Sequence, residues 1–392
     1  MQPYGCLSTG QVEPQDLGRH HGKPRTILTP DPTLTEKGER VRTRRQFARD
    51  AASTVACVLI ESRFGSAARA QAALSTRRQI VIGGRRVKII DVHAHCVVPG
   101  VMEMVGQTTP TAPFLLMTAE RLTEMDQQGI DVEVLSINPF WYGAERDLAR
   151  RLVQTQNEKL AAFCAAHADR FVGLATVALQ HPDMAAEQLE EGIKKLGLRG
   201  VSIGASVNGE ELASTKFDPF WAKAEAMGAP VFIHPQGVLE LRRLRGNGLL
   251  TNVIGNPLDT TIALSHLIFE GTLDRFPGLK ICAAHGGGYL PSYADRSDHG
   301  CLTFPQQCNK TLEKRPTDYL KQLYFDSLVF TGEALRHLIA VCGVSQIVLG
   351  TDYPYPWTSS AVDHVLGTPG LRDADKVAIL GGNAARLLNL GA

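Results

Sequence analysis

Short β-branched runs alternate with longer amphipathic stretches from Val87 to the end of the chain. This alternation predicts parallel strands joined by helices, which is an α/β arrangement. Eight strands within roughly 270 residues predict a (β/α)8 TIM barrel, with residues 87–392 as one domain. The strand candidates are 87–95, 131–137, 171–177, 200–207, 230–235, 280–287, 323–329 and 346–353. The main helical stretches are 147–167, 183–196, 217–227, 261–271 and 333–342.

A doubly wound open sheet is the alternative arrangement of the same elements. Sheets of that kind often hold nucleotide phosphates in a glycine-rich turn after the first strand. No G-x-G-x-x-G or P-loop pattern follows the first predicted strand, residues 87–95. Neither usual nucleotide signature therefore supports the open sheet.

Histidine and aspartate residues stand at the ends of four predicted strands. His93 and His95 end the first strand, His234 the fifth, His285 the sixth and Asp352 the eighth. One histidine at a strand end is more often a hydrogen-bonded structural residue, and an aspartate before Tyr-Pro is often a turn former. In a barrel these ends meet at one mouth, so the joint pattern indicates a metal site. Three imidazoles and one carboxylate suit Zn²⁺, with a position left for water or substrate.

The charge distribution and the cysteines narrow the functional class. Residues 1–86 contain 15 Lys and Arg against 7 Asp and Glu, whereas the remainder contains 26 against 33. An acidic body without a basic stripe argues against nucleic acid as a partner.

No apolar run reaches the roughly 18 residues of a membrane span, so no stable membrane insertion is expected. The eight cysteines form no C-x-x-C pair and are expected to be mostly reduced, with a Cys301–Cys308 bridge left open.

The N-terminal part of the chain differs from the predicted barrel. Residues 1–42 are rich in Pro, Gly, Thr and charge, without periodicity, and are expected to be disordered. Residues 43–72 carry paired arginines, a weakly apolar stretch and the small-residue tail SAARAQA, which resembles a twin-arginine export signal. Residues 73–86 are expected to form a linker or a short β segment. A periplasmic location follows from this reading; the alternative is a basic, solvated helix on a cytoplasmic protein.

Several longer motifs carry a resemblance to a known family. Together they resemble the amidohydrolase superfamily, and within it the branch containing aminocarboxymuconate semialdehyde decarboxylase. The resemblance extends from Ile89 to Gly391 and implies a TIM barrel of the metal-dependent hydrolase type. The motifs are IDVHAH (90–95), RLTEMDQQGID (121–131), RFVGLATV (170–177), FIHP (232–235), DTTIALSHLIFEGTLDRFPGLKICAAHGGGYLP (259–291), ADRSDHG (294–300) and LGTDYPYP (349–356).

The resemblance assigns roles to the strand-end residues. It implies His285 as the catalytic acid/base, assisted by Asp352. The fourth predicted strand, residues 200–207, contains no lysine, whereas dinuclear members of the superfamily have a carbamylated lysine there, so one metal per chain is favoured. The metal is expected to be Zn²⁺, with Mn²⁺ or Fe²⁺ as alternatives, and no organic cofactor is expected. The implied ligands are His93, His95, His234 and Asp352.

Substrate contacts are expected from Arg296 and from residues near the predicted mouth. Arg296 falls where the decarboxylase contributes an arginine across a homodimer interface to a substrate carboxylate, a task that the guanidinium fork suits; the alternative is an interfacial ion pair. Two features depart from the family: residues 108–117 contain no basic side chain, and Gln236 stands where the decarboxylase has an aromatic residue. Phe140 and Trp141, followed by Tyr142, either form an apolar wall for a planar substrate or pack a loop.

The activity expected from these features is metal-dependent, non-oxidative decarboxylation. The substrate is a small aromatic or conjugated unsaturated carboxylic acid, and His285 and Asp352 move the proton that replaces CO₂. The alternative is a metal-dependent hydrolase acting on an amide, ester, lactone or carbon–carbon bond, or a hydratase. A non-catalytic binding protein is disfavoured because the implied ligand set and the catalytic histidine are both complete.

Overall fold

The computed structural model describes residues 77–109, 119–236, 241–244, 249–308, 310–358 and 360–391. The predicted disordered extension (1–42) and the predicted twin-arginine segment (43–72) lie outside these residues, as does the start of the segment 73–86. The described residues all belong to one compact unit. None of their helices is long and apolar enough to cross a membrane.

All eight predicted strands are present, and every pairing among them is parallel. Each is shorter than its apolar run because regular pairing stops where the chain turns into the loops at the barrel ends. The strands are β3 (Ile90–His95), β4 (Val132–Ser136), β5 (Phe171–Gly173), β6 (Val201–Gly204), β9 (Pro230–His234), β10 (Lys280–Ala283), β11 (Tyr324–Asp326) and β12 (Ile347–Val348).

Two isolated bridges close these strands into a barrel. Three strands pair in the order β3-β4-β5, and the other five in the order β12-β11-β10-β9-β6. A bridge from Ala175 to Val201 joins β5 to β6, and a bridge from Ala94 to Tyr353 joins β3 to the segment after β12. Closure leaves no free sheet edge. The predicted (β/α)8 barrel is therefore confirmed, and the open sheet is excluded.

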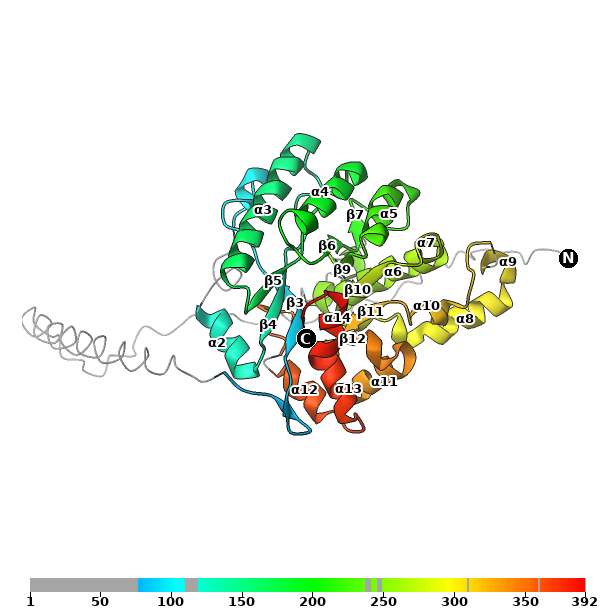
Figure 1. Ribbon diagram of the computed structural model, residues 1–392. Helices are drawn as coiled ribbons and strands as arrows, with labels where there is room; N and C mark the ends of the chain where they lie inside the picture. The colour runs from blue at the N-terminus through cyan, green and yellow to red at the C-terminus, as the bar shows by residue number, and fades with distance from the viewer. Residues whose placement is uncertain are drawn as a thin grey trace, which may run out of the picture. The chain divides into compact units, whose positions relative to one another are not determined.

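Helices surround the strands, which occupy the centre of the unit (Figure 1). The predicted helical stretches are found with shifted ends. The largest shift is at α6, which begins five residues before the predicted 261, because Pro257 sits in its first turn, where a missing N–H is tolerated. The longer helices are α2 (Ala119–Gln128), α3 (Arg146–Ala166), α4 (Pro182–Lys194), α5 (Asp218–Ala226), α6 (Asn256–Phe269), α8 (Ala294–Thr303) and α11 (Gly332–Cys342).

Side chains from most of the strands fill the barrel interior. Ile90 and Val92 from β3 belong to an inner cluster with Phe232 from β9, and α14 (Asn383–Leu387) adds Leu387 to it. The pairing of β3 with β4 shifts register between Asp91 and Ala94. Such an irregularity re-aims side chains along a strand. Because of it, β3 points apolar residues into the barrel at its start and histidines at its end.

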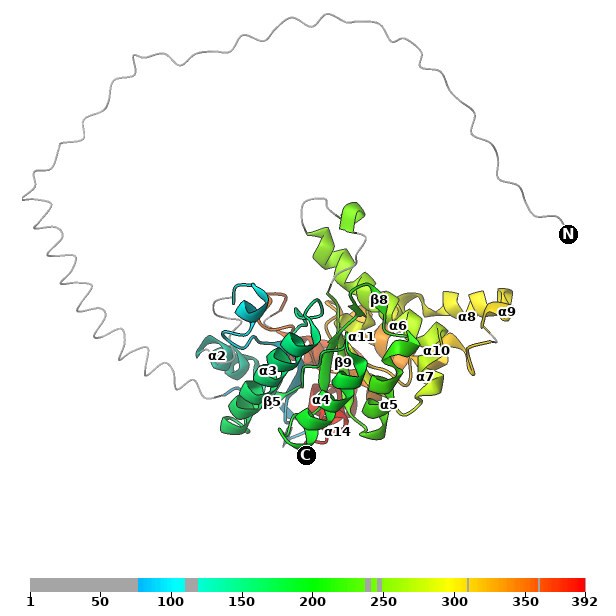
Figure 2. The ribbon, with the colours of Figure 1, turned by 90° about the horizontal axis from the view of Figure 1, so that it is seen from above.

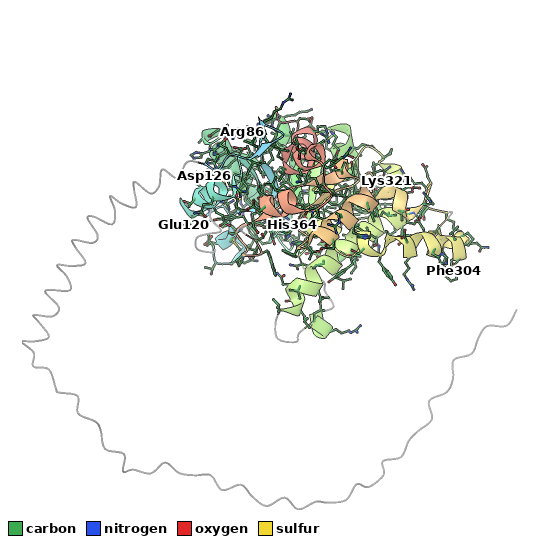
Figure 3. The ribbon with its side chains drawn as sticks, turned by 90° about the horizontal axis from the view of Figure 1, so that it is seen from below. Arg86, Glu120, Asp126, Phe304, Lys321 and His364 are labelled. Carbon is green, nitrogen blue, oxygen red and sulfur yellow. A yellow bond between two sulfur atoms is a disulfide. The ribbon has the colours of Figure 1, made fainter. Side chains whose placement is uncertain are left out.

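Two features extend beyond the ring of helices. The yellow-green segment before α6 rises from the unit in the view from above (Figure 2), and it contains η4 (Thr251–Gly255). Helix α8 and the short α9 (Pro305–Cys308) form an arm, with Phe304 at its outer end (Figure 3). A Cys301–Cys308 disulfide joins the two helices of this arm. The pairing that the sequence left open is thus present, whereas Cys96, Cys164, Cys282 and Cys342 are free, as expected.

Candidate metal centre

The five predicted strand-end residues lie together at the C-terminal mouth of the barrel. His93 and His95 are in the last part of β3, and His234 is the last residue of β9. His285 follows β10 by two residues, and Asp352 follows β12 by four. Parallel strands bring these ends to one side of the sheet, so residues up to about 260 positions apart become neighbours.

The nitrogen and oxygen atoms of this group converge on one point. The two Nε2 atoms of His93 and His95 are 3.0 Å apart. Asp352 Oδ1 lies 3.1 Å from the first and 2.9 Å from the second. Asp352 Oδ2 lies 3.6 Å from His285 Nε2. His93, His234, His285 and Asp352 each offer a ligand atom within 4.8 Å of the others.

Neighbouring polar groups orient the two histidines of β3. His93 Nδ1 lies 2.6 Å from Asp326 Oδ2, so that its Nε2 is directed toward Asp352. His95 Nδ1 lies 3.1 Å from the hydroxyl of Ser136, which has the same effect on that ring. A carboxylate or hydroxyl behind an imidazole is the usual support of a metal-binding histidine.

The group fits a divalent metal ion. Both ring nitrogens of His234 are buried and lack a hydrogen-bond partner among the described residues. Burial lowers the pKa of His95 to about 4 and holds the pKa of His234 well below its usual value, so both rings are neutral at pH 7. Neutral imidazole is the form that binds metal. Three nitrogens with one carboxylate match the donor set of a zinc or related site.

Two carboxylates make this point favourable for positive charge. Burial alone lowers the pKa of His93, but Asp352 and Asp326 raise it to about 10. Burial opposes ionisation of Asp352, yet the nearby histidines hold its pKa far below the usual range. A buried carboxylate pair around one imidazole favours a cation there, either a proton or a metal ion.

The backbone is strained at two members of the group. His285 has φ of 56° and Asp352 has φ of 62°, a left-handed conformation that residues with a Cβ rarely adopt. Asp326 supports the first of these by accepting hydrogen bonds from the backbone N–H groups of His285 and Gly286, each at 2.8 Å. Strain of this kind clusters at functional sites, where the surrounding structure holds a side chain in place.

Asp326 is a site residue that the sequence analysis missed. It ends β11, the seventh barrel strand, and is fully buried. Its signal in the sequence is a single carboxylate inside the apolar run LYFDSLV (323–329). An acidic residue at such a position needs buried partners, which the distant His93 and His285 supply.

Two cavities open at the cluster and share Asn252, Asn256 and Asp352. One, of about 300 Å³, is lined mainly by polar side chains, including Asn138, His234 and Gln236. The other, of about 500 Å³, is mainly apolar and contains His285. Its apolar wall consists of Val253, Pro257, Tyr289, Leu328, Val329, Phe330 and Trp357. The apolar wall and two members of the cluster, His285 and Asp352, therefore border the same cavity.

Of the residues predicted to contact substrate, some line the cavities and others do not. Gln236 lines the smaller cavity, and its contact with a substrate stays a prediction. Trp141 is fully buried and donates from Nε1 to the Val177 carbonyl at 2.9 Å, and Phe140 packs partly buried against the core. Neither lines the cavities, so the interpretation of them as a substrate wall is corrected: they pack a loop. The apolar wall of the larger cavity includes two other aromatic residues, Phe330 and Trp357, from the segments after the seventh and eighth strands.

Arg296 lies away from the cluster of its own chain. It is on α8, with its guanidinium 6.0 Å from the ring centre of Tyr293. It lines a separate cavity of about 530 Å³ together with Asp295, His299 and His337. Contact between Arg296 and the mouth of the same barrel is therefore absent from the described structure.

The chain is similar to proteins of known activity. The amidohydrolase family model matches residues 90–390. The chain is 34% identical over 273 residues to 2-amino-3-carboxymuconate-6-semialdehyde decarboxylase of Dictyostelium discoideum, covering 69% of this chain and 76% of that protein. This relative confirms the branch indicated by the sequence motifs.

Solved structures agree with this placement. The crystal structure of 5-carboxyvanillate decarboxylase from Sphingomonas paucimobilis matches with a TM-score of 0.72 at 26% identity, covering 78% of this chain and 100% of that one. Dihydroxybenzoic acid decarboxylase from Polaromonas sp. JS666, solved with manganese and the inhibitor 2-nitroresorcinol, matches with a TM-score of 0.69 at 26% identity, covering 78% and 97%. The chain belongs to the amidohydrolase family.

Proposed function

We propose that this protein is a metal-dependent, non-oxidative decarboxylase of an aromatic or conjugated unsaturated carboxylic acid. The observation that carries the proposal is the position of His285: its ring lies beside Asp352 and borders the apolar cavity of about 500 Å³. A proton donor, a metal-type cluster and an aromatic wall thus face one space. The relatives and structural neighbours named above are decarboxylases.

His93, His95, His234 and Asp352 hold one divalent metal in this proposal. Zn²⁺ is the metal that the sequence pattern favours, and the manganese in the Polaromonas structure makes Mn²⁺ the first alternative. A bound divalent ion polarises carboxylate or hydroxyl oxygens of a substrate and offsets their negative charge. No organic cofactor is required, because the conjugated system of the substrate gives an electron pair to the incoming proton and regains a pair when the C–C bond breaks.

His285 supplies the proton that replaces CO₂. Its Nε2 transfers a proton to the carbon that bears the carboxylate, so a C–H bond forms while the substrate's π system loses two electrons. The C–C bond to the carboxylate then breaks, its electron pair restores the π system, and CO₂ leaves. Asp352, whose Oδ2 lies 3.6 Å from His285 Nε2, holds the imidazole in the orientation needed to donate. Charge and atoms balance without an oxidant.

The test of this activity is direct. Protein loaded with Mn²⁺ or Zn²⁺ is incubated with a panel of hydroxybenzoic and muconic-type acids, and released CO₂ is measured. Release from at least one acid is expected. Cleavage of esters or lactones without any CO₂ release would instead support the hydrolase alternative.

Three histidine variants test the assigned roles. His285→Ala is expected to abolish turnover and retain one metal per chain, whereas His93→Ala is expected to lose the metal. His266→Ala is the matched control, because His266 is on the outer surface at the end of α6 and pairs with Glu270. Metal content is measured by elemental analysis. Loss of metal from His285→Ala would make His285 a ligand, and two metals per wild-type chain would refute the mononuclear assignment.

A homodimer in which Arg296 serves the partner's mouth forms the second part of the proposal. Its support is that Arg296 lines a separate cavity and not the mouth of its own barrel, and that the arm carrying it exposes the apolar side chains of Leu302 and Phe304. Mixing inactive Arg296→Ala and His285→Ala proteins is expected to restore part of the activity, since hybrid dimers contain one complete site. No recovery after subunit exchange would refute this arrangement.

Export by the twin-arginine route remains part of the proposal, supported by the paired arginines and the small-residue tail within residues 43–72. N-terminal sequencing of the protein from a periplasmic fraction is expected to begin after this segment. A cytoplasmic chain that starts at residue 1 would refute export.

A further inference from the structure

Asn138 presents an unused hydrogen-bond acceptor beside the metal cluster. It follows β4 by two residues and lines the smaller cavity with His234 and Asp352. Its amide oxygen is buried and accepts no hydrogen bond from the described part of the chain. A buried acceptor without a donor is unfavourable, so such an atom next to a cavity indicates a donor supplied by what the cavity binds.

The loop that carries Asn138 is held from both sides. Trp141 donates from Nε1 to the Val177 carbonyl at 2.9 Å, and its own carbonyl accepts from Gln180 Nε2 at 2.9 Å. The Tyr142 hydroxyl accepts from the backbone N–H of Gly204 at 3.1 Å. The two aromatic residues thus anchor in the core the loop that carries Asn138.

Gln236 fixes the same loop from the opposite strand end. Its side-chain Nε2 donates to the carbonyl of Pro139, directly after Asn138. Its backbone N–H donates to Asp259 Oδ2 at 2.8 Å. A Cβ at Gly204 would lie 2.3 Å from Gln236 Oε1, so glycine is needed there to admit this side chain. Gln236 is therefore a positioning residue for Asn138.

The arrangement of the two cavities lets one substrate molecule contact the apolar wall and also donate a hydrogen bond to Asn138. They share Asn252, Asn256 and Asp352, so the polar cavity and the apolar cavity adjoin at these residues. An aromatic ring against Phe330 and Trp357 directs a ring substituent toward the polar side. A hydroxyl is the substituent that can donate to an amide oxygen.

Resting on the proposed decarboxylase function, we propose that Asn138 determines substrate specificity by accepting a hydrogen bond from a ring hydroxyl of the substrate. The selected substrates are accordingly hydroxyaryl carboxylic acids. Analogues in which this hydroxyl cannot donate leave the buried oxygen of Asn138 unpaired, and they bind more weakly.

The test compares hydroxybenzoic acids with their fluoro analogues, since fluorine is similar in size to hydroxyl and cannot donate. Binding to Mn²⁺-loaded protein is measured by titration calorimetry for hydroxyl or fluorine at each ring position. At one position the wild type is expected to favour the hydroxyl by about 10- to 100-fold. Asn138→Leu and Asn138→Ala are expected to reduce this ratio to about threefold or less, with metal content and thermal stability checked for both.

Two further variants separate recognition by Asn138 from general damage. Asn138→Asp keeps an acceptor and is expected to retain the preference for the hydroxyl. Asn252→Ala alters another amide of the same space and is expected to bind all the acids more weakly with the wild-type ratio. Three results would overturn the proposal. They are a wild-type hydroxyl-to-fluorine ratio in Asn138→Leu, a wild-type protein that prefers the hydroxyl at no ring position, and an equal loss of preference in Asn252→Ala. Absence of CO₂ release from every acid would refute the decarboxylase function, whereas the binding ratios still decide the role of Asn138.

Discussion

At the residue scale, Asp326 connects the ring of His93 to the backbone of His285. One carboxylate oxygen, Oδ2, accepts from the backbone N–H of His285 at 2.8 Å and lies 2.6 Å from His93 Nδ1. The other, Oδ1, accepts from the backbone N–H groups of Gly286 at 2.8 Å and Leu328 at 3.1 Å. Both oxygens are therefore needed as acceptors, and an amide cannot replace them.

Asp326→Asn is expected to weaken metal binding by about 10- to 100-fold. The amide NH₂ faces N–H donors in either orientation, which turns His93 away from the cluster. Metal titration in a competing chelator measures the change. Asp318→Asn is the control, because Asp318 pairs with Arg315 on the surface. Unchanged affinity in Asp326→Asn would show that His93 is oriented by other contacts.

Arg121 and Glu133 form a buried ion pair behind β3. Arg121 donates to Glu133 Oε2 at 2.6 Å and to the carbonyl of His95 at 2.5 Å. Both side chains are almost fully buried, at 0% and 2% exposure, and the guanidinium lies 4.5 Å from the ring centre of Tyr353. Removing the arginine leaves a buried carboxylate without its main compensating charge.

Arg121→Met is expected to lower the free energy of unfolding by about 3–5 kcal/mol at pH 7. Burial already raises the pKa of Glu133 and Arg121 opposes this, so the variant raises it further. A raised pKa favours the protonated folded state, and this contribution is lost as pH increases. The defect is therefore smaller at pH 5 than at pH 8.

Urea denaturation at the two pH values measures this difference. The double variant Arg121→Met/Glu133→Leu is expected to recover most of the loss, because it buries no charge at this position. An equal defect in the single and double variants would show that lost packing, and not the unpaired carboxylate, is responsible.

At the scale of elements, the short helix η8 (Ala378–Gly382) packs against the start of β3. A Cβ at Gly381 would lie 2.0 Å from the carbonyl oxygen of Lys88, which is closer than any real contact. At the next residue, Gly382, the nearest atom to such a Cβ is 3.4 Å away. Glycine is therefore required at position 381, where the helix backbone approaches the backbone of Lys88, but not at position 382.

Gly381→Ala is expected to destabilise the protein by about 1–3 kcal/mol, because the helix must move away from β3. Gly382→Ala is expected to change stability by no more than about 1 kcal/mol, since the helical conformation accepts alanine. Denaturant unfolding of the pair measures both. Equal stability of the two variants would contradict the close contact.

The elements themselves were largely predictable, whereas loop roles were not. The periodicity of IDVHAH and of residues 147–167 is local, so it indicates β3 and α3 without knowledge of their neighbours. The role of Trp141 depends on the Val177 carbonyl, which another strand end supplies. An aromatic residue in a loop has the same sequence appearance whether it binds a ligand or anchors the loop.

At the scale of the whole molecule, the metal is expected to bind the folded barrel alone, because its proposed ligands come from two separate strands, β3 and β9, and from the segment after β12. Adding Zn²⁺ or Mn²⁺ to chelator-treated protein is expected to raise the melting temperature, with about 2.7 kcal/mol of stabilisation at a metal concentration 100 times the dissociation constant. Thermal melts at several metal concentrations measure the increase.

His93→Ala is expected to show no such increase, and His266→Ala is expected to show the full increase. A rise of equal size in His93→Ala would place the metal elsewhere in the molecule.

The sequence by itself determined the barrel, the strand-end histidines and the aspartate, because strand and helix periodicity and residue type are local properties. Tertiary structure alone decided which residues complete the site. The contacts of Asp326 with His93 and of Gln236 with the loop of Asn138 join residues roughly 100 to 230 positions apart, and only closure of the barrel sets those distances. The exclusion of Trp141 from the cavities has the same cause, since burial is a property of the whole packing arrangement.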